Sequence, residues 1–159
     1  MIDDVTPALT VIATVGCGLI GGLLFAFSVA VMPALARRPA AEGMAAMQAV
    51  NRVILNPVFL LIFVGTTAIC AFLAVTAPFA EVGGAGWRGA GALAYLVGAF
   101  VVTGAANVPL NDRLEAADAH SEEGERLWRH YLRRWTAWNH LRVVASVVAT
   151  AALATGQAA

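Results

Sequence analysis

The stretch ILNPVFLLIFVGTTAICAFLAVTA, residues 54–77, decides the fold of this chain. It contains no acidic or basic side chain, and about 20 apolar residues in a helix are enough to cross the hydrocarbon core of a bilayer. Three further apolar stretches without acidic residues, roughly 7–32, 89–110 and 136–156, predict three more spans, and only the last contains an arginine, Arg142. We therefore expect an all-α, integral membrane four-helix bundle that forms one domain over residues 1–159.

The composition agrees with a membrane protein. Hydrophobic residues make up 60% of the chain and charged residues 13%, whereas a soluble domain has about 25% charged residues. The formal net charge is zero, so we expect the lipid bilayer as a partner and no nucleic acid. Cys17 and Cys70 lie in apolar stretches without a CxxC pairing, which indicates inert buried thiols.

Arginine is concentrated in two of the three connections between the spans. Connections 33–53 and 111–135 carry several arginines each, whereas connection 78–88 carries only Arg88. Because basic residues gather on the cytoplasmic side, we expect the first and third connections in the cytoplasm and both termini outside the cell (inner) membrane. Ser121 followed by acidic residues predicts that the fourth helix begins near residue 121, as an amphipathic cytoplasmic extension leading into the span.

Small residues recur at four-residue spacing in two spans. The first span carries Gly18, Gly22, Ala26 and Ala30, and the third carries a weaker version, namely Ala90, Ala94 and Gly98. Such faces let helices approach closely, within the bundle or between copies of the chain. A homo-oligomer formed through these faces is one expectation.

Polar residues at membrane depth gather at the predicted cytoplasmic end. On the fourth helix, a spacing of 3.6 residues per turn places one polar and aromatic stripe on a single face. The stripe consists of Trp128, Tyr131, Trp135, Trp138, Asn139, Arg142 and Ser146. Asn107 and Asn111 share a face at the end of the third span, and Asn51 and Asn56 open the second.

Arg142 is the most informative member of this set. It lies roughly 10 Å along the helix from Trp135, at 1.5 Å per residue, and therefore below the membrane interface. An unpaired cation at that depth costs at least about 2.5 kcal/mol, and no span supplies a carboxylate to neutralise it. A ligand with an anionic or strongly dipolar group would complete the site. The asparagines are also explained by hydrogen bonds between helices, at about 0.6 kcal/mol each.

Other polar residues give weaker signals. Pro109 either ends or kinks the third span, or frees the carbonyl of Ala105 to face the cluster. His130 and His140 fall away from the stripe, and His120 lies in a connection, so we expect no metal site.

Four pieces of sequence carry a resemblance to a known family. They are FAFSVAVMPAL (25–35), MQAVNRVILNP (47–57), NVPLNDRL (107–114) and WTAWNHLR (135–142). Together they resemble the anthrone oxygenase-like family of small four-span membrane proteins, over about residues 8–155. The family pattern falls on Asn51, Asn56, Pro57, Asn107, Pro109, Asn111, Trp135, Trp138, Asn139 and Arg142.

The resemblance implies an oxygenase that converts anthrones to anthraquinones with molecular oxygen and no cofactor. An anthrone becomes electron-rich when it loses a ring-carbon proton, so such a site needs an oxyanion stabiliser, a flat aromatic slot and dryness. The expected catalytic residues, which hold the oxyanion, are Arg142, Asn107, Asn111 and Asn139. The expected substrate-binding residues are Asn51, Asn56, Tyr131, Trp135 and Trp138. No base is assigned, because Glu115 and Asp118 lie beyond Pro109 and Tyr131 is a weak base at neutral pH.

Two other readings remain open at this point. The same cluster suits a protein that binds or transports an amphiphilic aromatic or quinone-like molecule unchanged. A structural protein, oligomeric through its Gly/Ala faces, would use the amides only as links between helices. A small multidrug exporter is excluded because its first span needs a carboxylate, and a quinone-reducing thiol enzyme because it needs a CxxC.

Overall fold

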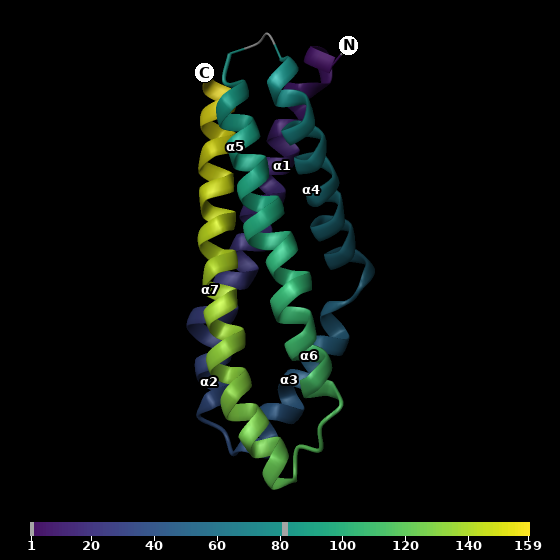
Figure 1. Cartoon of the computed structure of the whole chain (residues 1–159), viewed down its shortest axis with the longest axis vertical. Helices are drawn as coiled ribbons and strands as arrows, with labels where there is room; N and C mark the ends of the chain where they lie inside the picture. The colour runs from purple at the N-terminus through teal and green to yellow at the C-terminus, as the bar shows by residue number, and fades with distance from the viewer. Residues whose placement is uncertain (1, 81–82) are drawn as a thin grey trace.

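The computed structural model describes residues 2–80 and 83–159, and its elements are helices and helical turns. Four continuous helical stretches are long and apolar enough to cross a membrane, and they pack side by side as an elongated bundle (Figure 1). They are Val5–Ala36, Pro57–Phe79, Ala85–Glu115 and Glu122–Ala158. The expected all-α bundle of four spans is therefore confirmed.

In the described part of the chain, six α-helices and short helical turns build the four stretches, and a seventh α-helix, α3, lies in the connection between the first and the second. The α-helices are α1 (Ile2–Ala26), α2 (Met32–Ala36), α3 (Ala40–Ile54), α4 (Pro57–Thr76), α5 (Ala85–Tyr95), α6 (Val108–Glu115) and α7 (Glu122–Ala158). The turns are π-helical at Phe27–Val31, Leu96–Val101 and Thr103–Asn107, and 3-10 at Ala77–Phe79.

The two ends of the bundle differ in what they carry. Both chain ends and the α4–α5 connection lie at one end, whereas α2, α3, α6 and the start of α7 lie at the other (Figure 1). The two arginine-rich connections therefore share one end, as their charge pattern predicts. We call this the arginine-rich end.

Helix α7 is central to the packing because small residues let α1 and α5 approach it. A Cβ atom added to Gly21 would lie 3.0 Å from Cβ of Ser146, and one added to Gly91 would lie 3.0 Å from the carbonyl oxygen of Ala149. Cys17 of α1 and Cys70 of α4 are buried, with their sulfur atoms 4.0 Å apart. The core is therefore filled from all four spans.

The Gly/Ala stripe of the first span does not form the internal contact. Gly18, Gly22, Ala26 and Ala30 are exposed on the surface of the bundle. The buried face of α1 is offset from this stripe, and it includes Ala13, Cys17, Ile20 and Leu24. The stripe therefore lies at the edge of the contact with α7, where a Cβ added to Gly18 would be 3.9 Å from Thr150, and contact between copies stays a prediction.

Two span boundaries differ from the sequence-based expectation, and the start of the fourth helix agrees with it. The second span begins at Pro57, because α3 ends at Ile54 and Asn56 caps a new helix. The third span passes through Pro109 and continues to Glu115, because Thr103–Asn107 forms a π-helical turn and proline occupies the first turn of α6. The fourth helix begins at Glu122, with the Ser121 hydroxyl accepting from the Gly124 amide at 2.9 Å, as predicted.

Candidate functional site

A cavity of about 100 Å³ lies inside the half of the bundle nearer the arginine-rich end. Apolar residues of the first span, α3 and α4 form much of its wall, among them Leu24, Phe27 and Phe59. Its nitrogen-bearing side chains come from α3, the third span and α7. They are Asn51, Asn107, Asn111, Trp135 and Arg142.

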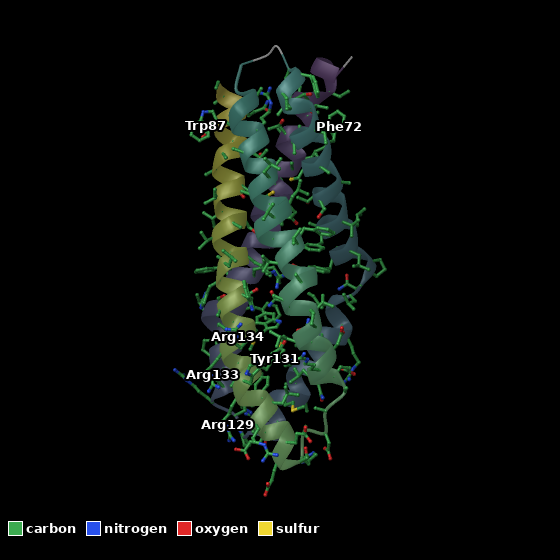
Figure 2. The ribbon with its side chains drawn as sticks, in the orientation of Figure 1. Phe72, Trp87, Arg129, Tyr131, Arg133 and Arg134 are labelled. Carbon is green, nitrogen blue, oxygen red and sulfur yellow. The ribbon has the colours of Figure 1, made fainter. Side chains whose placement is uncertain are left out.

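The α7 stripe faces the interior as its helical spacing predicts. Tyr131, Trp135, Asn139, Arg142 and Ser146 are all buried. Figure 2 shows Tyr131 between α7 and the other helices, with Arg129 and Arg133 on the outer side of α7.

Trp138 departs from this stripe. It is only partly buried, and its ring stacks outside the cavity under Arg134, whose guanidinium carbon lies 6.0 Å from the ring centroid.

Arg142 is buried without a partner. The side chain is 5% exposed, and its Nε forms no hydrogen bond. Among the residues that the structure describes, none forms an ion pair or a hydrogen bond with this guanidinium. A charged group in a membrane interior costs at least about 2.5 kcal/mol, so the unpaired Arg142 lowers the stability of the ligand-free protein.

The second buried arginine provides a direct contrast. Arg88, at the opposite end of the bundle, is 6% exposed. Its Nη1 donates to the carbonyl oxygens of Gly83 at 2.8 Å and Gly156 at 2.9 Å. Arg88 therefore joins the start of α5 to the end of α7, whereas Arg142 forms no such bond between helices in the described part of the chain.

The cavity presents further unpaired polar atoms beside Arg142. The amide nitrogen of Asn107 donates to the Trp135 carbonyl at 3.3 Å, which turns its Oδ1 away as a buried acceptor without a partner. Trp135 Nε1 and Asn51 Nδ2 are buried donors without a partner in the described part of the chain. Buried polar groups are normally hydrogen-bonded, so this set of donors around one acceptor fits a ligand that carries oxygen atoms.

A stack of aromatic rings lies behind the cavity wall, and of its three members only Trp135 lines the cavity. Tyr131 stacks on Trp128 with ring centroids 5.7 Å apart, and on Trp135 with centroids 5.9 Å apart. The Tyr131 hydroxyl donates to Asn111 Oδ1 at 2.9 Å, which joins α7 to α6. Tyr131 thus supports two cavity residues, Asn111 and Trp135, from behind.

Two of the expected site asparagines lie elsewhere. Asn139 is buried beside the cavity, and its amide nitrogen donates to the Leu24 carbonyl and to Ser28 Oγ, both at 2.8 Å. Asn56 is exposed, and its Oδ1 accepts from the Phe59 amide at 3.0 Å as the cap of α4. The structure therefore uses the Asn139 nitrogen to join α7 to α1, and Asn56 to begin a helix.

This placement predicts a stability effect for Asn139. Replacing Asn139 by Leu removes the bond between α7 and α1, and the free energy of unfolding should fall by about 0.6 to 1.7 kcal/mol. Thermal unfolding in mild detergent measures the change, with His140→Leu, at an exposed position on the same helix, as the comparison. An unfolding midpoint as high as that of the wild type would show that the Leu24 and Ser28 contacts do not stabilise the bundle.

An outer hollow adjoins the cavity on the side of α6. It measures about 230 Å³ and shares Asn51, Ile54, Leu55, Val108 and Asn111 with the cavity wall. Its remaining wall consists of Arg52, Asp112 and Glu115. The sequence does not identify Asp112 and Glu115 as site residues, because they come after Pro109, where the helix was expected to end.

The comparisons with known proteins decide the family. A family model described as anthrone oxygenase matches residues 59–152. The chain belongs to the anthrone oxygenase family. The matched segment contains Asn107, Asn111, Trp135 and Arg142, and Asn51 lies before it. No curated protein and no solved structure matches the chain.

Proposed function

We propose that this member of the anthrone oxygenase family is a membrane-embedded oxygenase that acts on a polycyclic phenolic ketone of the anthrone type. The observation that carries the proposal is the Arg142 guanidinium, buried in an apolar cavity with no partner in the described part of the chain. A preorganised donor in a dry site stabilises negative charge far better than one in water.

The proposed reaction uses molecular oxygen as the oxidant and needs no separate reductant. Loss of a proton from the ring methylene turns the ketone into a phenolate, and Arg142 holds the oxyanion. Dioxygen takes two electrons as a carbon–oxygen bond forms, which gives a hydroperoxide after protonation. Loss of water from the hydroperoxide leaves the second ketone, so anthrone and dioxygen become anthraquinone and water.

The other cavity residues take supporting roles in this proposal. Asn51 Nδ2 and Trp135 Nε1 donate to oxygen atoms of the ligand, and Asn107 Oδ1 accepts from a phenolic hydroxyl. Asn111 helps to hold the oxyanion, positioned by its bond to Tyr131. Asn139 acts through α1, because its nitrogen is already bonded there.

The cellular setting is also part of the proposal. The four apolar helices belong in a bilayer, and the arginine-rich end faces the cytoplasm of a cell (inner) membrane, with both termini outside. An apolar ligand would reach the bundle through the bilayer. The exposed Gly18 and Gly22 leave room for a second copy of the chain.

Oxygen consumption tests this function directly. The full chain in lipid nanodiscs, supplied with anthrone, should take up one dioxygen per anthraquinone formed, at a rate well above that of empty nanodiscs. An oxygen electrode and chromatography of the product measure both quantities. Uptake no faster than the spontaneous background would rule out the oxygenase.

One observation favours a second candidate, a protein that binds an amphiphilic aromatic or quinone-like molecule without changing it. No acidic residue or histidine lies among the described residues that line the inner cavity, so no strong base sits there. This candidate predicts saturable quenching of tryptophan fluorescence by anthraquinone, together with background oxygen uptake.

A further inference from the structure

The outer hollow extends the inner cavity toward water. The two share a wall along Val108 and Asn111, and the half-exposed Val108 and exposed Leu55 border the outer part. Helix α3 ends at Ile54 and α4 begins at Pro57, so the chain bends at this border. The hollow therefore lies between this bend and α6.

The inner cavity is too small for a whole polycyclic molecule. Its volume is about 100 Å³, whereas pockets for drug-sized ligands measure about 300–1,000 Å³. A three-ring ligand whose oxygen meets Arg142 must extend through the shared wall into the outer hollow of about 230 Å³. The two hollows then act as one binding site.

The chemistry of an anthrone fixes which part extends outward. Its ketone carbon and its acidic methylene carbon face each other across the central ring. With the ketone oxygen held at Arg142, the methylene hydrogen points away from Arg142 and toward the outer hollow. The proton must therefore leave on that side.

Two carboxylates line the outer hollow, and they are in different states. Glu115 forms an ion pair with Arg52, with Oε1 2.5 Å from Nη1. Asp112, three residues earlier on α6, has no ion-pair or hydrogen-bond partner for its side chain among the described residues. Its carboxylate is therefore not held by another side chain and can accept a proton.

We propose that Asp112 is the base that removes the methylene proton, an inference that rests on the proposed function. The carbon–hydrogen bond breaks, the proton passes to a carboxylate oxygen of Asp112, and the electron pair moves through the ring to the ketone oxygen at Arg142. The base and the oxyanion donor then lie at opposite edges of one substrate ring. A positioned base of this kind contributes about 100- to 10,000-fold to a rate.

Hydrogen–deuterium exchange without oxygen isolates this step. Anthrone is incubated in deuterated buffer with the full chain in nanodiscs, and the methylene deuterium is followed by mass spectrometry. Asp112→Asn should slow both the protein-dependent exchange and the oxygen uptake by about 100-fold or more. Anthraquinone binding, measured by tryptophan quenching, should stay within about 3-fold of the wild type, which also shows that the variant is folded.

Two further variants sharpen the test. Glu123→Gln removes an exposed carboxylate at the same end of the bundle and should leave the exchange unchanged. Asp112→Glu keeps a carboxylate and should restore part of the exchange rate. A large loss in Glu115→Gln, with wild-type exchange in Asp112→Asn, would assign the base to Glu115 and overturn the inference.

The inference and the proposed function fail in different ways. Oxygen uptake by Asp112→Asn at the wild-type rate would refute the role of Asp112 and leave the oxygenase standing. Exchange that depends on Asp112, in a wild-type protein without oxygen uptake, would support the base and refute the oxygenase. A wild-type protein that catalyses neither would overturn both.

Discussion

Arg142→Met should lower anthrone turnover by about 100- to 1,000-fold, the usual cost of removing one oxyanion donor. Methionine fills similar space, so the packing of α7 is kept while the charge in the cavity is lost. The effect arises because the guanidinium has no partner among the described residues, and the negative charge that develops on the substrate would be its counterion. Oxygen uptake and anthraquinone formation in nanodiscs measure the change.

A matched variant lies on the exposed side of the same helix. Arg133→Met also removes one positive charge from α7, but this side chain is exposed and does not line the cavity, so turnover should not change. Arg142→Lys keeps the positive charge but loses the planar donor geometry of guanidinium, so it should keep only part of the activity. Full turnover in Arg142→Met would refute the oxyanion role.

The helical period explains how much of this site follows from the sequence. The recurrence of Tyr131, Trp135, Asn139 and Arg142 puts them on one face, and a membrane-depth charge must face the interior. Their burial confirms that step. Trp138 lies at the edge of this face, so it is only partly buried, and there it contacts Arg134.

Other features depended on local bonds that the pattern does not reveal. The pattern places Asn56 in the second span as a polar site residue. Asparagine before a proline is also a typical helix cap, and the structure shows Asn56 in that role. The π-helical turn before Pro109 cannot be predicted from the residue pattern, because it is defined by its backbone hydrogen bonds. Without it, α6 and the carboxylate of Asp112 cannot be placed beside the cavity.

The two buried arginines should respond oppositely when each is replaced by methionine. Arg88→Met leaves the Gly156 and Gly83 carbonyls without their donor, so the free energy of unfolding should fall by about 1–3 kcal/mol. Arg142→Met removes a buried charge with no partner in the described chain, so the free energy of unfolding of the ligand-free protein should rise by about 2.5 kcal/mol. Thermal unfolding of both variants in the same detergent measures the contrast.

Ligand binding supplies the control for this contrast. A saturating concentration of anthraquinone should raise the unfolding midpoint of the wild type and of Arg88→Met, because a ligand that binds only the folded state stabilises it. It should leave Arg142→Met almost unchanged. A protein that keeps a costly unpaired cation gives up stability for function. If Arg142→Met instead unfolds as readily as Arg88→Met, Arg142 is a structural residue and the ligand is not its missing partner.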